Sequence, residues 1–102
     1  IVGLETAFAV AYTELVLGGV LTLPELVARM STQPARIFHL PGGTLAVGAP
    51  ADVVVLDPGA QWTVEPAAFR SKSRNTPFTG RALTGRAALT LVAGKTVHDA
   101  AL

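Results

Sequence analysis

Hydrophobic positions near the start of the chain repeat at the spacing of an α-helix. Between residues 4 and 17, apolar side chains recur every three or four positions, at Leu4, Phe8, Ala11 and Leu15. Glu5 and Glu14 fall on the other side of the same helix. The pattern predicts an amphipathic helix that buries Phe8 and Leu15 and ends at Gly18 and Gly19, because glycine readily leaves the helical conformation.

Two more helices are expected before residue 44. Thr22 can cap a second helix whose first turn carries a proline and a glutamate, both favoured at that place. A third, short helix is expected over residues 34–40, capped by Ser31 or Thr32. The Pro-Gly-Gly sequence at 41–43 would end it.

After residue 43 the spacing changes to that of β-strands. The expected strands are about residues 45–47, 53–56, 61–64, 86–92 and 95–98, with one helical turn at 66–69. The first two strands are expected to pair, and residues 53–56, including Val54, to be covered on both faces because all four are apolar. Asp57-Pro58-Gly59 should turn the chain, and Gly94 should lie in a hairpin turn. Helices followed by an antiparallel sheet indicate the α+β class.

Composition limits the class of protein. The 102 residues are about one domain long, half of them hydrophobic and only 15% charged. This balance is too apolar for a disordered tail, and we expect some apolar surface to contact a missing partner. No apolar run is long enough for a membrane span, so no membrane partner is expected. The absence of cysteine excludes disulfides and thiolate metal sites and is compatible with a cytoplasmic location.

The positive charges gather in the C-terminal half, although the net charge is only +1. Residues 66–98 contain no acid and six cations, Arg70, Lys72, Arg74, Arg81, Arg86 and Lys95. Three of them lie in residues 70–80, the basic loop, which charge repulsion and Pro77 should keep extended. Only Phe69 and Phe78 flank it as aromatics, so no nucleic-acid partner is expected.

Residues able to do chemistry are sparse. His39 and His98 are far apart, with no His-x-His spacing; the first is expected at a helix end and the second at an exposed strand end. Asp52 is expected to satisfy turn amides. Glu5 is expected in the first turn of its helix, where it favours the helix dipole, with a substrate-side role as the alternative. No catalytic and no metal-binding residue is therefore predicted in this chain.

Two segments carry a resemblance to a known family. Residues 2–7 (Val-Gly-Leu-Glu-Thr-Ala) and 71–78 (Ser-Lys-Ser-Arg-Asn-Thr-Pro-Phe) resemble the C-terminal part of bacterial dihydroorotases, in the amidohydrolase superfamily. Residues 32–38 and 45–57 are similar to segments of many cyclic-amide hydrolases and indicate the superfamily only. The resemblance runs from residue 1 to about residue 98.

The resemblance implies a fragment of a larger enzyme, because a metal-dependent hydrolase barrel needs about 250 residues. Residues 1–43 would be the terminal helices of a (β/α)8 barrel. Residues 44–102 would be the C-terminal part of a composite β-sandwich domain, completed by N-terminal strands.

The implied activity is the reversible conversion of N-carbamoyl-L-aspartate to L-dihydroorotate in pyrimidine biosynthesis. In that family zinc is held by an upstream His-x-His pair, further histidines and usually a modified lysine, and a late-barrel aspartate moves the proton. None of these positions matches this chain, so zinc is expected in the intact enzyme but not on this fragment, which alone should be inactive.

The resemblance also suggests roles for two segments. The family's substrate-contacting loop would lie immediately before Ile1, which places Ile1, Val2 and Gly3 at its edge. The basic loop has no acids near it in sequence. We expect it to dock the small domain against the barrel, mainly through Arg70, Lys72, Arg74 and Asn75, with direct substrate contact as the alternative.

Several partners and functions stay open. The expected partners are the remainder of the dihydroorotase chain, a second copy in a homodimer, or aspartate carbamoyltransferase. A related hydantoinase or allantoinase, or a catalytically inactive dihydroorotase-like subunit, would share the same superfamily motifs. A stand-alone module that binds an anion or an acidic partner is the third alternative.

Overall fold

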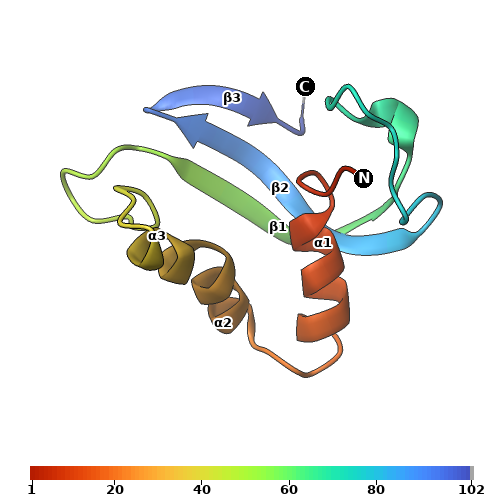
Figure 1. The fold of residues 1–102 in the computed structure, drawn as a ribbon, viewed down its shortest axis with the longest axis horizontal. Coiled ribbons are helices and arrows are strands. Elements are labelled where there is room, and N and C mark those ends of the chain that lie inside the picture. Colours follow the sequence, from red (N-terminus) through yellow and green to blue (C-terminus); the bar gives the residue numbers. More distant parts are fainter. Residues whose placement is uncertain (102) are drawn as a thin grey trace.

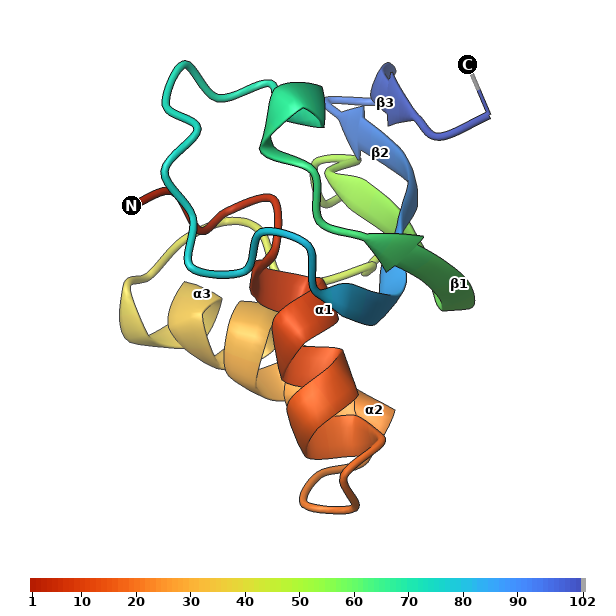
Figure 2. The ribbon, with the colours of Figure 1, turned by 90° about the vertical axis from the view of Figure 1, so that its right-hand side faces the viewer.

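Helices and a three-stranded antiparallel sheet form two layers in the computed structural model, which describes residues 1–101 (Figure 1). The helices lie on one side of the sheet in both ribbon views (Figures 1 and 2). This confirms the α+β class. Within residues 1–101, no helix has the length and apolar content needed to cross a membrane.

The first predicted helix is present. The α-helix α1 (Ala7–Ala11) continues into a π-helical turn, η1 (Tyr12–Val16), in which the amide of Leu17 donates to the carbonyl of Tyr12 at 3.0 Å. The helix ends before Gly18, and Gly19 follows with a φ of +79°. The hydrophobic spacing and the glycine pair therefore identified this element correctly.

The second and third predicted helices are one continuous helix. It comprises α2 (Leu23–Val27), a π-helical turn η2 (Ala28–Thr32) and α3 (Gln33–Ile37). Its start is as expected: Thr22 Oγ1 accepts from the amide of Glu25 at 3.3 Å, and the Glu25 carboxylate accepts from the amide of Thr22 at 3.2 Å. These reciprocal contacts form a capping box.

The expected helix start at Ser31 or Thr32 is wrong. Thr32 has helical dihedral angles and makes no side-chain cap. The amide of Gln33 instead donates to the carbonyl of Ala28, five residues earlier. This wide turn lets Pro34, which has no N–H, lie inside the helix without breaking it.

The sheet has the strand order β1–β2–β3, with both pairs antiparallel. The strands are β1 (Val53–Thr63), β2 (Ala82–Val92) and β3 (Lys95–Asp99). The hairpin predicted around Gly94 is confirmed. Ala93 and Gly94 both have positive φ, of 50° and 77°, as the favoured two-residue hairpin turn requires.

The strand predicted over residues 45–47 is wrong. Leu45 is 80% exposed, Val47 is fully exposed, and the amide of Ala49 closes a turn onto the carbonyl of Ala46 at 3.1 Å. Within residues 1–101, β1 pairs only with β2, so the segment has no strand to pair with. For the same reason the expected covering of both faces of 53–56 is wrong, and Val54 is 49% exposed.

The expected turn at Asp57-Pro58-Gly59 is a bulge that does not reverse the chain. Asp57 pairs with Arg86 and Gln61 pairs with Thr84, so three residues of β1 lie opposite one residue of β2. The Asp57 carboxylate accepts from the amide of Gly59 at 3.1 Å, which stabilises the bulge. Residues 61–63, predicted as part of a separate edge strand, continue β1.

The core lies between α1 and the central strand β2. Ala9, Val64, Phe69 and Leu83 are buried together, and Val2, Val10, Trp62 and Phe78 pack against them. The predicted helical turn before Phe69 is present as the 3₁₀ turn η3 (Pro66–Ala68). Phe8 and Leu15, expected to be buried, are half-buried. The domain boundary at residues 43 and 44 stays a prediction.

Gly85 allows α1 to approach β2 closely. Its φ is +94°, and a Cβ placed on it would lie 3.1 Å from Tyr12 Cδ1 and 3.3 Å from Phe8 Cε2. The adjacent residue Thr84 exchanges two hydrogen bonds with the hydroxyl of Thr13, at 3.0 and 3.2 Å. The indole of Trp62 donates to the Gly85 carbonyl at 3.0 Å. Helix, bulged strand and central strand therefore meet at one glycine.

Candidate functional site

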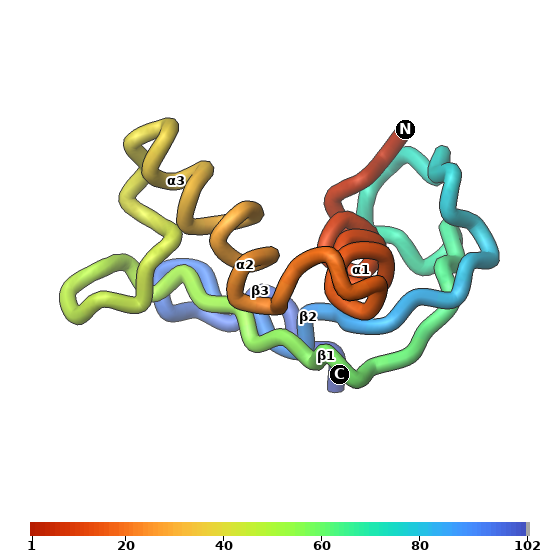
Figure 3. The backbone as a smooth tube through the Cα atoms, turned by 90° about the horizontal axis from the view of Figure 1, so that it is seen from below, coloured from red at the N-terminus to blue at the C-terminus, as the bar shows by residue number. Residues whose placement is uncertain are grey.

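The N-terminal segment, residues 1–5, and the basic loop lie side by side at one end of the molecule (Figures 2 and 3). The amide of Val2 donates to the carbonyl of Asn75 at 2.8 Å. Val2 also packs against the core, whereas Ile1 is almost fully exposed. Gly3 accepts from the amide of Thr6 at 3.2 Å, which turns the chain into α1. The two segments that carry the family resemblance are thus in contact.

Glu5 makes the main polar contact between these segments. Its carboxylate accepts hydrogen bonds from the backbone amides of Arg70 and Ser71, both at 3.1 Å, and from the hydroxyl of Ser71 at 3.0 Å. Hydrogen bonds to an ionised carboxylate are stronger than those between neutral groups. Glu5 therefore holds the beginning of the basic loop against the N-terminal segment.

These contacts change the acidity of Glu5. Partial desolvation by itself raises the pKa of the carboxyl group, but the amides of Arg70 and Ser71, the Ser71 hydroxyl and the positive charge of Arg74 lower it. The net effect holds the pKa of Glu5 below its ordinary value of 4.5. Glu5 is therefore ionised at neutral pH, in the state that accepts all three hydrogen bonds.

Arg74 stabilises the loop from within. Its guanidinium donates to the carbonyl of Phe69 and, at 2.7 Å, to the carbonyl of Ser71. The hydroxyl of Ser73 accepts a hydrogen bond from the amide of Asn75 at 3.2 Å. The side chain of Arg74 and the carbonyls of Phe69, just before the loop, and Ser71, within it, are thus used to fix the loop's conformation.

Arg70 and Lys72 present exposed side chains. Among residues 1–101 the only ion pair joins Arg81 and Glu14, so neither of these two cations has an acidic partner in the described part of the chain. Arg81 also lies over the ring of Phe78, with 5.9 Å between the guanidinium carbon and the ring centroid. Of the four residues expected to dock, only Arg70 and Lys72 have charged groups left for a partner.

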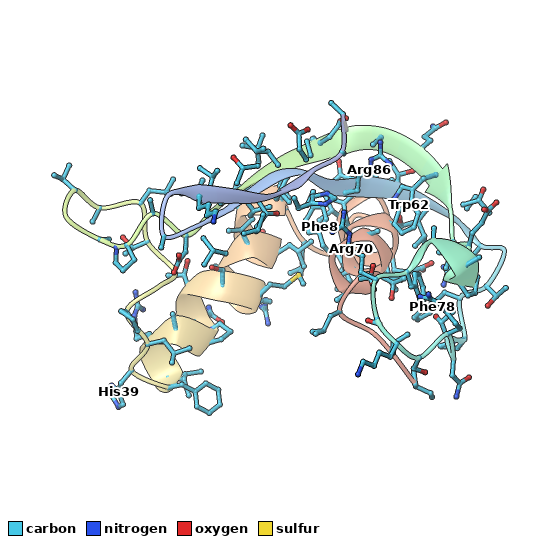
Figure 4. All side chains as sticks on the ribbon, turned by 90° about the horizontal axis from the view of Figure 1, so that it is seen from above. Phe8, His39, Trp62, Arg70, Phe78 and Arg86 are labelled. Atoms are coloured by element: carbon cyan, nitrogen blue, oxygen red, sulfur yellow. The ribbon has the colours of Figure 1, made fainter. Side chains whose placement is uncertain are left out.

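The histidines do not take part in this site. His39 is exposed at the end of α3, and Figure 4 shows it well separated from Arg70. His98 was expected to be exposed, but it is half-buried, with its ring Nε2 3.3 Å from the carbonyl of Ala87 across the sheet. In the described residues, no three His, Cys, Asp or Glu side chains lie close enough to hold a metal ion.

Asp52 has the structural role expected of it. Its carboxylate accepts from the amide of Ala93 at 2.8 Å, in the turn between β2 and β3. The hydroxyl of Ser71 donates to the Glu5 carboxylate, and no histidine within residues 1–101 is placed to act on it as a base.

The expected role of Glu5 at a helix dipole is wrong. The N-cap of α1 is Thr6, and the first turn of the helix contains no acid. Glu5 lies before the helix, and its side chain reaches a loop 65 residues away in sequence. No local pattern predicts such a contact. The absence of acids in residues 66–98 indicated only that an acidic partner of the basic loop would come from another segment.

Comparisons with known proteins agree on the family. The model of the amidohydrolase family matches residues 5–98. The dihydroorotase of Anaeromyxobacter dehalogenans strain 2CP-1 is 57% identical over 99 residues, and that of Syntrophus aciditrophicus is 52% identical over 97 residues. These matches cover 97% and 95% of this chain, but 23% and 22% of the relatives. The chain thus spans about a quarter of the length of these curated relatives.

Solved structures with the same fold include hydantoinases. The L-hydantoinase (dihydropyrimidinase) of Arthrobacter aurescens superposes with a TM-score of 0.89 at 38% identity, covering 96% of this chain and 22% of that one. The D-hydantoinase of a Thermus species gives a TM-score of 0.88 at 31% identity, covering 97% and 22%. The arrangement of helices and sheet described above is thus found within larger hydrolases.

Proposed function

This chain belongs to the amidohydrolase family, and we propose that it forms the C-terminal part of a dihydroorotase. The activity of the whole enzyme would be the reversible conversion of N-carbamoyl-L-aspartate to L-dihydroorotate in pyrimidine biosynthesis. The observation that carries the proposal is the 57% identity to a curated dihydroorotase over nearly the whole chain.

The same observation favours dihydroorotase over the nearest alternative. The hydantoinase structures superpose well, but their identity is 38% or lower in the examples above, against 52–57% for the dihydroorotases. A hydantoinase, an allantoinase and an inactive dihydroorotase-like subunit are therefore second candidates. A stand-alone anion-binding module is a weaker one, because the two cations available for it are not set in a built pocket.

Within the enzyme this chain would supply scaffold rather than reacting groups. Residues 1–43 would be terminal helices of the barrel, and residues 44–102 part of the composite β-sandwich domain. The donor groups of residues 1–101 do not fit a zinc site, since no three of them converge. If the parent binds zinc, its ligands would come from the rest of the polypeptide.

The basic loop would help to dock this chain onto the rest of the enzyme. Arg70 and Lys72 are exposed and lack acids of their own, which suits docking onto an acidic face of the remaining polypeptide. Ile1, Val2 and Gly3 would lie at the edge of the substrate loop. The whole enzyme would be cytoplasmic, and a homodimer or a complex with aspartate carbamoyltransferase is a further possible assembly.

A substrate comparison tests the proposed function. The full-length polypeptide containing this chain would be purified with its metal and assayed with L-dihydroorotate, 5-substituted hydantoins and allantoin. We expect turnover of dihydroorotate with a kcat/KM well above that for the other two substrates. Preference for hydantoin or allantoin would assign the enzyme to the sister activity, and no turnover of any of them would favour an inactive subunit.

A further inference from the structure

The contacts of Glu5 join two segments that are far apart in sequence. One is the N-terminal segment, whose Val2 amide donates to Asn75. The other is the basic loop, whose first two amides donate to Glu5. Each segment has contacts that hold it to the other, and the Glu5 carboxylate supplies the negative charge at this junction.

Arg74 supports the junction. Its guanidinium donates to the carbonyl of Phe69, which belongs to the same planar peptide unit as the Arg70 amide, so this contact helps to orient that amide toward the carboxylate. The positive charge of Arg74 also favours an anion at that position. Replacement of the carboxylate by a carboxamide would keep one acceptor oxygen and leave at least one of the three donors facing an NH2 group, so the loop would lose contacts that hold it in place.

We propose that Glu5 is a positioning residue: its carboxylate fixes the basic loop, and through the Val2–Asn75 hydrogen bond it fixes Ile1, Val2 and Gly3 as well. In this role Glu5 would act through the two segments and not by contact with the substrate. This inference rests on the proposed function for its kinetic consequence, because it is there that residues 1–3 lie at the edge of the substrate loop. Its structural part, the coupling of the two segments, does not depend on any activity.

The chain offers a matched control. Glu25 is likewise an exposed carboxylate that accepts hydrogen bonds from a hydroxyl and a backbone amide, both of Thr22. These bonds hold the pKa of Glu25 below its ordinary value, and the hydroxyl has the larger effect. It lies at the start of α2, on a different element from both segments of the junction. Glu25→Gln therefore removes a comparable charge and hydrogen-bond acceptor without touching the junction.

The experiment compares Glu5→Gln, Glu5→Asp and Glu25→Gln in the full-length polypeptide. Hydrogen exchange measures the amides of Val2, Arg70 and Ser71. For Glu5→Gln we expect all three to exchange about tenfold faster or more, including Val2, which Glu5 does not contact directly. Glu25→Gln should leave these three amides unchanged, and Glu5→Asp, which keeps the charge, should restore part of their protection.

Steady-state kinetics with L-dihydroorotate supply the second measurement. For Glu5→Gln we expect KM to rise about fivefold or more with kcat within about twofold, as for a residue that positions a binding element rather than a reacting group. Unchanged exchange at Val2 would overturn the coupling whether or not the protein is active. Faster exchange with an unchanged KM in an active enzyme would overturn the positioning role.

These outcomes separate the inference from the proposed function. If the unsubstituted polypeptide does not turn over dihydroorotate, the proposed function fails. What remains of the inference is then the coupling of the two segments, and the hydrogen-exchange rate of the Val2 amide alone supports or overturns it.

Discussion

Among the described residues, Glu5 is the carboxylate that accepts two backbone amides from a distant loop. Asp52 accepts a single amide from a residue 41 positions away, whereas Asp57 and Glu25 accept from residues two or three positions away. Local partners of this kind can be predicted from sequence, and the helix cap at Thr22 was predicted in this way. The partner of Glu5 could not be predicted, because a contact across 65 residues of sequence results from the fold and not from a local pattern.

Acid should weaken the Glu5 contact. The pKa of Glu5 in the folded chain lies below 4.5, so its contribution to stability is fully present above that value and is lost as the pH falls through the folded-state pKa. Glu5→Gln should therefore lower Tm at pH 7 and lower it by less at pH 3. Thermal unfolding of both proteins at the two pH values checks this. Glu65→Gln, at an exposed glutamate, serves as the control, and an equal deficit at both pH values would contradict the account.

Gly85 yields a second prediction at the scale of one residue. Alanine there would combine a positive φ with a Cβ 3.1 Å from the Tyr12 ring, and we expect Gly85→Ala to lower the free energy of unfolding by about 2 kcal/mol or more. Gly80 has a similar φ of +77° but nothing within 4 Å of the added Cβ, so Gly80→Ala isolates the backbone cost, about 1 kcal/mol. Urea unfolding measures the free energy lost in each variant. Equal losses would show that α1 does not lie close enough to β2 to clash with the added Cβ.

At the scale of elements, local signals predicted where helices and hairpins occur but not how far strands extend. The glycine pair, the Thr22 cap and the turn at Gly94 each act within a few residues. The turn signal at Asp57-Pro58-Gly59 was instead overridden by pairing with β2, which continues on both sides of the bulge. Periodicity likewise suggested a strand over residues 45–47, where the described chain offers no partner.

Burial within these elements gives a further prediction. Leu83, on the central strand, is 2% exposed, and Leu83→Ala should cost about 2–5 kcal/mol of unfolding free energy. Val54, on the outer strand β1, is 49% exposed, so Val54→Ala should cost about 1 kcal/mol or less in this chain. Urea unfolding of the 102-residue chain provides the measurement. A loss at Val54 as large as that at Leu83 would mean that the outer face of β1 is covered.

At the scale of the whole molecule, exposed apolar side chains and cations without acids suggest a surface shared with more polypeptide. Large apolar residues at and after the end of α3, among them Ile37, Phe38, Leu45 and Val47, are more than half exposed. The relatives that match are about four times as long. We therefore expect the fold described here to be stabilised by the rest of the protein in the intact enzyme.

The docking role of the basic loop can be tested in the intact protein. Replacing Arg70 and Lys72 together with glutamine should lower Tm by several degrees and raise KM less than about tenfold. Lys95→Gln, which removes an exposed cation from β3, is the control and should leave Tm nearly unchanged. A tenfold or larger rise in KM at an unchanged Tm would instead assign these cations to the substrate.

The central claim, that this chain is scaffold of a larger dihydroorotase, is tested most directly by measuring turnover of L-dihydroorotate and bound zinc in two proteins. One is the full-length polypeptide and the other is the 102-residue chain alone. We predict turnover and tightly bound zinc for the first and neither for the second, because no three metal-binding side chains converge within residues 1–101. Stoichiometric zinc or measurable turnover in the isolated chain would contradict the account.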